Sequence, residues 1–102
     1  MDMPIACSLD AVDVRTQVDE WRSLLTQIVT EVERQTSASV TMRLAANTQA
    51  LAALVELARR EAACCQFFRF AVEIDAEGAS FTASVPPHAI ELLDGFAALA
   101  SR

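Results

Sequence analysis

Residues 68–85, Phe-Arg-Phe-Ala-Val-Glu-Ile-Asp-Ala-Glu-Gly-Ala-Ser-Phe-Thr-Ala-Ser-Val, hold two runs of alternating apolar and polar residues on either side of Gly78. Alternation with a period of two puts the apolar side chains on one face of a strand, and glycine suits the tight turn between paired strands. The stretch therefore predicts an antiparallel hairpin with one buried face, which a second layer must cover. The residues predicted to face that layer are Phe68, Phe70, Val72, Ile74, Phe81, Ala83 and Val85.

Helical segments on both sides of the hairpin can supply the second layer. Apolar residues at helical spacing predict a long amphipathic helix over roughly residues 11–35. The same spacing predicts a second helix over residues 47–65, with Asn47 as its N-cap, and a third helix that starts at Pro87.

Two further strands are predicted from alternation, over residues 4–9 and 40–45. Each of the four strands has one apolar face, so the helices should lie on one side of the sheet. We therefore expect a single α+β domain over residues 1–102, a two-layer sandwich in the order β-α-β-α-β-β-α with a four-stranded mixed sheet. The opposite, polar face of the sheet is left for water or a second subunit.

The charge balance argues against a nucleic-acid partner. The 102 residues include 14 acidic and 8 basic ones, and the net charge of −6 would repel phosphate. The hydrophobic content is sufficient for a buried core, yet no apolar stretch approaches the roughly 20 residues that span a bilayer. The start of the chain lacks the pattern of a secretion signal, so we expect a cytoplasmic protein. Thiols stay reduced there, which favours thiols or metal ligands over a disulfide framework for the three cysteines.

Two adjacent cysteines, Cys64 and Cys65, are the chemically unusual feature of the chain. Glu61 precedes them by three and four positions, so the three side chains can converge on the last turn of the second helix. Cys7 falls on the inward face of the strand predicted over residues 4–9, which would bring a third sulfur toward the pair. Thiolates suit a soft ion such as mercury, arsenite, copper(I) or zinc. The candidate metal ligands are therefore Cys7, Cys64, Cys65 and Glu61.

Two alternatives to metal binding stay open at this point. In the first, the cysteines only fill the core, and the polar sheet face or the first helix binds a second copy of the chain or a regulator protein. In the second, the protein is a thiol enzyme that acts on organometals or disulfides. This second alternative fits less well, because a helix C-terminus and the neighbouring Glu61 both favour the protonated thiol and no base is placed beside it. No catalytic residue and no organic cofactor are nominated.

The same residues resemble the pattern of a group of small bacterial proteins that have an Ala-Cys-Ser start and a Glu-x-x-Cys-Cys-Pro-Phe-Phe-x-Phe signature. The matching segments are residues 6–8, 61–70 and 85–87, and Gln66 stands where the signature has proline. The group is loosely associated with mercury and arsenic resistance and with the regulators of such systems. The resemblance implies that Cys7, Cys64 and Cys65 are ligands, with Glu61 as a fourth ligand or a supporting group.

Overall fold

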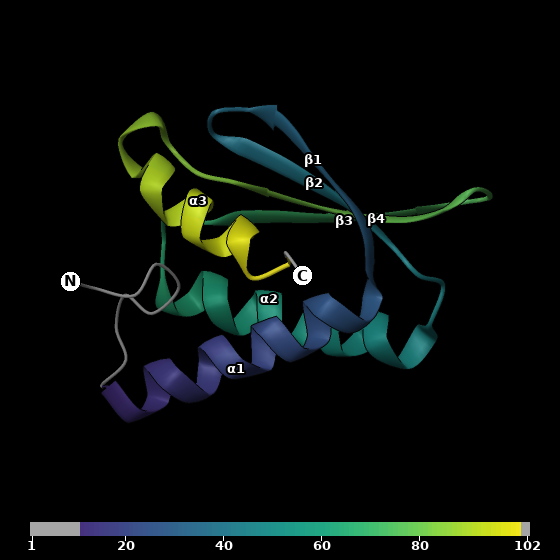
Figure 1. Cartoon of the computed structure of the whole chain (residues 1–102), viewed down its shortest axis with the longest axis horizontal. Helices are drawn as coiled ribbons and strands as arrows, with labels where there is room; N and C mark the ends of the chain where they lie inside the picture. Colours follow the sequence, from purple (N-terminus) through teal and green to yellow (C-terminus); the bar gives the residue numbers. More distant parts are fainter. Residues whose placement is uncertain (1–10, 101–102) are drawn as a thin grey trace.

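The computed structural model describes the backbone of residues 11–100 and the side chains of residues 16–100. Figure 1 shows two layers, with the helices on one side of a single sheet. The predicted α+β fold with helices on one face is confirmed. The strand predicted over residues 4–9 lies outside the described residues. The described elements are α1 (Ala11–Ile28), β1 (Val29–Thr36), β2 (Ser39–Leu44), α2 (Thr48–Cys64), β3 (Arg69–Asp75), β4 (Gly78–Ser84), the short 3₁₀ turn η1 (Pro87–Ala89) and α3 (Ile90–Ala98).

The sheet has the strand order β1-β2-β4-β3, and all three neighbouring pairs are antiparallel. This differs from the mixed sheet that we expected. The reason is that β1–β2 and β3–β4 are both hairpins with two-residue connections, which force antiparallel pairing, and the two hairpins then join through β2 and β4. The predicted hairpin of residues 68–85 is confirmed, with Val72 opposite Phe81 and Gly78 at φ 139° just after the turn. Glycine adopts that backbone conformation without the strain that a side chain would add.

The helix predicted over residues 11–35 is confirmed for residues 11–28 and wrong for residues 29–35. The helix α1 ends at Ile28, and the chain passes directly into β1 at Val29. Val29 and Val32 continue the apolar spacing of the helix, which is why periodicity alone extended it. The segment is nevertheless rich in β-branched residues, and pairing with β2 decides its conformation, with Val32 opposite Met42.

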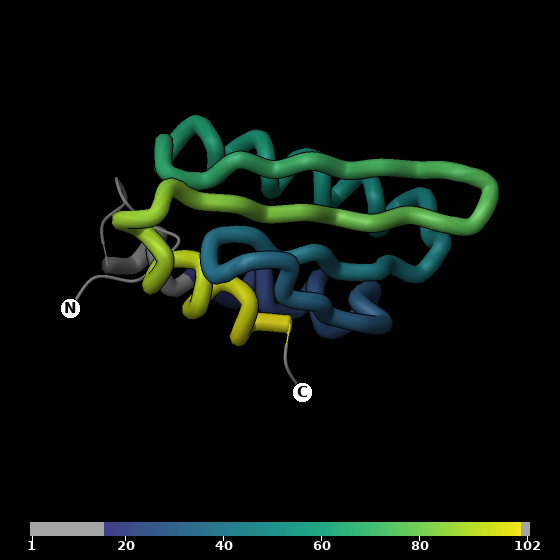
Figure 2. The backbone as a smooth tube through the Cα atoms, turned by 90° about the horizontal axis from the view of Figure 1, so that it is seen from above, coloured from purple at the N-terminus to yellow at the C-terminus, as the bar shows by residue number. Residues whose placement is uncertain are grey.

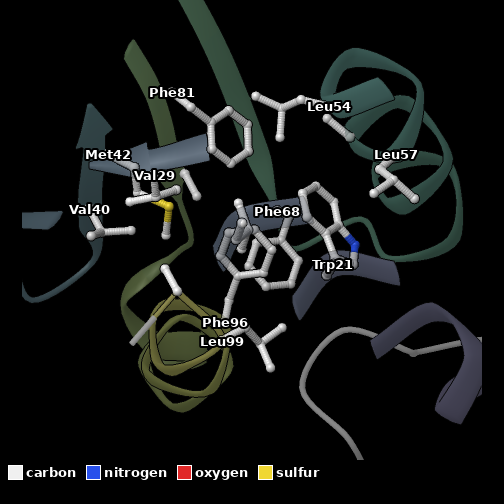
Figure 3. Packing of buried hydrophobic residues seen from close by; sticks show 14 of the residues in the cluster. Trp21, Val29, Val40, Met42, Leu54, Leu57, Phe68, Phe81, Phe96 and Leu99 are labelled. Atoms are coloured by element: carbon white, nitrogen blue, oxygen red, sulfur yellow. The ribbon is translucent and has the colours of Figure 1, made fainter. Parts of the chain in front are cut away.

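The core lies between the sheet and the helices and is centred on Trp21 of α1, which is 0% exposed. Its indole contacts rings from the sheet and from α3: the ring centroids lie 4.9 Å from Phe96, 5.9 Å from Phe70 and 6.1 Å from Phe81. Figure 3 shows Trp21 beside Phe68 and Phe96, with Leu54 and Leu57 of α2 closing the cluster. All three helices and the two central strands therefore share one core. Within the described part of the chain, no helix combines the length and the apolarity needed to cross a membrane.

Candidate thiol site

The two cysteines lie where α2 ends, and they differ in their surroundings. The helix spans Thr48–Cys64, and the side chain of its N-cap Asn47 accepts a hydrogen bond from the Ala50 backbone N–H at 3.0 Å. Cys65 adopts an extended conformation, with φ −130° and ψ 104°, while its N–H still donates to the Glu61 carbonyl oxygen at 2.7 Å. This change of backbone direction turns Cys65 into the core, where it is 0% exposed, and leaves Cys64 half-buried.

Cys65 is disulfide-bonded. This differs from the reduced thiols that the sequence favoured. The structure places Cys64 outside that disulfide. Cys7, the third cysteine of the sequence, lies outside the described residues.

Glu61 is a fully buried carboxylate, 0% exposed, on the core side of the last turns of α2. Its Oε1 accepts a hydrogen bond of 2.6 Å from the side-chain amide of Gln17 on α1. Burial raises the pKa of Glu61, and the hydrogen bond from Gln17 and the nearby Trp21 indole lower that pKa in part. Among the described residues, neither Glu61 Oε2 nor Trp21 Nε1 completes a hydrogen bond of ordinary geometry. Glu61 is therefore engaged with α1 in the interior and is not exposed to solvent beside the cysteines.

Gln17 was not singled out from the sequence. It is 94% buried, since its exposed fraction is 6%. A signal for it did exist, because Gln17 precedes Trp21 by one helical turn and so shares the apolar face of α1. A polar residue in such a stripe needs a partner. Its partner, 44 positions away in the sequence, could not be identified without the packing of α1 on α2.

A groove of about 390 Å³ runs past Cys64 between the start of α1 and the end of α2. Two arginines line it, and both are already paired with carboxylates. Arg60 donates to Glu20 at 3.1 Å and Arg59 donates to Glu56 at 2.6 Å. The groove therefore gives an ion or small molecule a route to Cys64, with charged side chains at its walls. The remaining lining residues are Thr16, Gln17 and Ala63.

Within residues 16–100, no three side chains of His, Cys, Asp or Glu are grouped so that they could hold a metal ion. The chain's one histidine, His88, lies against the Phe67 ring with the two ring centroids 5.4 Å apart. The complete ligand set suggested by the sequence includes Cys7, and so its geometry extends beyond the described residues.

The chain matches no family model, no curated protein and no solved structure. The chemistry of the site therefore has to be argued from its own residues.

Proposed function

We propose that the protein binds a soft metal or metalloid ion in the cytoplasm through its cysteine thiols, without catalytic turnover. The proposed ligands are Cys64 and Cys65, with Cys7 as the third, and the candidate ions are mercury(II), arsenite, copper(I) and zinc. Thiolates match these acceptors because both partners are soft and polarisable.

The disulfide at Cys65 is the observation that carries this proposal. A disulfide holds two sulfurs about 2.05 Å apart, whereas one ion with metal–sulfur bonds of about 2.3 Å holds two thiolates about 3.8 Å apart in a tetrahedral site and about 4.6 Å apart in a linear one. Reduction of the Cys65 disulfide would free two thiolates, which would have to move apart by about 2 Å to bind one ion between them. Two electrons and two protons from a thiol reductant supply that reduction.

The surroundings of the two cysteines support a retained ion. Cys65 belongs to the buried core cluster together with Phe68, so an ion bound there would be held away from water. Such a shell lowers the exchange of ligands with solvent. Half-buried Cys64, beside the groove described above, would receive the ion first.

Glu61 fits a positioning role better than a ligand role. Its Oε1 is occupied by Gln17, and using it as a ligand would leave the buried Gln17 amide without that acceptor. By joining α1 to the last turns of α2, Glu61 fixes the helix end from which Cys64 and Cys65 project.

The test is a titration of the reduced protein, freed of reductant, with mercury(II), arsenite and zinc(II), while accessible thiols are counted. Stoichiometric protection of thiols is expected, with weaker protection in Cys64→Ser, Cys65→Ser and Cys7→Ser. Glu31→Gln, at an exposed position of β1, serves as the matched control, since it keeps all thiols and should retain binding. If one equivalent of every ion leaves the thiol count unchanged, the protein is not a soft-metal binder.

A second candidate function is an interaction module in which the cysteines are structural. The complete burial of Cys65 in the core favours it, because a buried disulfide-bonded cysteine can serve stability alone. Retained partner binding in a variant that lacks all three cysteines would select this function over metal binding.

A further inference from the structure

We propose that a second copy of this chain docks on the outer edge of β3, so that two sheets join into one continuous antiparallel sheet. This inference concerns a surface remote from the metal proposal and does not depend on it. It rests on four observations: an edge strand, its self-complementary sequence, a largely apolar groove beneath it and exposed apolar side chains on β3 and α2.

β3 is an edge strand of the sheet. In the order β1-β2-β4-β3, its neighbour within the described residues is β4 on one side only. Seven residues, Arg69–Asp75, form this edge. The outward N–H and C=O groups of such an edge are a template for a further strand.

The sequence of β3 is complementary to itself when it runs antiparallel about Val72. A two-fold axis at Val72 places Arg69 opposite Asp75 of the second copy, and the reciprocal pair follows by symmetry. The same register places Phe70 opposite Ile74. The register therefore forms two ion pairs and two apolar pairs, while Glu73 of each copy lies opposite Ala71 of the other. Opposite-charge and aromatic–aliphatic cross-strand pairs both stabilise a sheet.

A groove of about 600 Å³ lies beneath this edge, between β3 and α2, and its lining is apolar except for Arg59, Gln66 and Arg69. Figure 2 shows α2 running below β3 along the same side of the molecule. The α2 residues in the groove are Val55, Ala58, Arg59 and Ala62. Ala58 belongs to the buried core, whereas Val55 and Ala62 are exposed apolar residues at the groove. Under the two-fold axis, the two α2 helices would run antiparallel with Val55 and Ala62 of each copy facing the other, and the small Ala62 would allow close approach.

The two most exposed large apolar side chains of the described residues lie on the two elements that border this groove, Ile74 on β3 and Val55 on α2. Ile74 is 71% exposed and Val55 is 50% exposed, ahead of Val32 on the opposite edge at 42%. In the proposed dimer Ile74 covers Phe70 of the second copy, and the Val55 side chains enter the helix contact. Burying these side chains removes apolar surface from water, which is the main driving force of association.

The experiment is the measurement of molar mass by light scattering and sedimentation across a concentration series of the full chain. The wild type should be a dimer that Ile74→Lys converts to a monomer with an unchanged circular dichroism spectrum. The matched control is Val32→Lys, a β-branched residue on the other edge strand, which should leave the dimer intact. Arg69→Asp should weaken the dimer about tenfold because two ion pairs become repulsive, and the double variant Arg69→Asp/Asp75→Arg should restore it.

Three outcomes would overturn the proposal. A wild-type monomer at every concentration is one, and a dimer insensitive to Ile74→Lys is another. A dimer broken by Val32→Lys instead would assign the contact to β1. Metal titration of the Ile74→Lys monomer keeps the two proposals separate, since thiol protection should be the same as in the wild type.

Discussion

The side-chain amide of Gln17 donates a 2.6 Å hydrogen bond to the buried carboxylate of Glu61 and thereby ties α1 to the end of α2 that carries the cysteines. Both residues are almost inaccessible to water, with exposed fractions of 6% and 0%. In such an environment a hydrogen bond to a charged group stabilises the fold more than its exposed equivalent, and its loss costs more.

Replacing Gln17 should destabilise the protein measurably. Gln17→Ala leaves the Glu61 carboxylate buried without its donor, and we expect the free energy of unfolding to fall by about 1–3 kcal/mol. Urea unfolding followed by circular dichroism measures this change. Gln27→Ala, an exposed glutamine on the same helix, should change stability by less than about 0.5 kcal/mol. Equal effects of the two variants would mean that the hydrogen bond has no special role.

Glu61 should lower the free energy of unfolding as the pH rises, whereas a carboxylate with a lowered pKa has the opposite effect. Burial raises its pKa in the folded protein above the unfolded value of about 4.3. Folding therefore favours the protonated carboxyl. The contribution of Glu61 to the free energy of unfolding is complete below the pKa that it has in the unfolded chain. That contribution should be lost as pH rises from the unfolded to the folded pKa.

The measurement is the difference in unfolding free energy between the wild type and Glu61→Gln at a series of pH values. Glutamine can accept from Gln17 and carries no charge, so the variant should gain on the wild type as pH rises through this window. A difference that stays flat with pH would show that burial does not perturb Glu61. Glu31→Gln, an exposed position on β1, controls for the general effect of removing one negative charge.

Reduction of the Cys65 disulfide should lower stability. A disulfide restricts the unfolded chain, so thermal unfolding with and without a phosphine reductant should differ by about 2–4 kcal/mol. Cys65→Ser should abolish this difference, whereas Cys64→Ser should preserve it, because Cys64 lies outside that disulfide. Loss of the reductant effect in Cys64→Ser would contradict the assignment.

The packing around Trp21 predicts an unequal cost for two phenylalanine truncations. Phe96 lies 4.9 Å from Trp21 between ring centroids and is 0% exposed, so Phe96→Ala should cost about 3–5 kcal/mol. Half-buried Phe67 contacts His88 at the end of the sheet, so Phe67→Ala should cost clearly less. Because the chain has one tryptophan, its fluorescence during denaturation reports directly on this cluster.

The sequence predicted an element correctly where its pattern of apolar residues fits one type of secondary structure only. Phe70 to Ile74 and Ala79 to Ala83 alternate strictly, and both form the predicted hairpin. Val29 and Val32 fit both a helix and a strand, and only the partner strand β2 resolves the choice.

Within the site, the local consequences of helix position could be predicted and the distant contacts could not. The core stripe of α2 ends at Cys65, so its burial followed from spacing, as did the location of Cys64 off that stripe. The engagement of Glu61 by Gln17 depends on how two helices pack, and the disulfide of Cys65 depends on which sulfur reaches it. Neither the Gln17–Glu61 hydrogen bond nor the Cys65 disulfide produces a periodic pattern that a single sequence would show.

The direct passage from Ile28 of α1 to Val29 of β1 constrains chain length at this junction. With no loop to absorb an extra residue, one insertion would rotate the preceding helix by about 100° relative to the sheet. Trp21 would then leave its ring cluster and Gln17 would leave Glu61 at the same time. Insertions should therefore be eliminated by selection at this junction and tolerated at the Ser37-Ala38 turn, where the chain reverses at the protein surface.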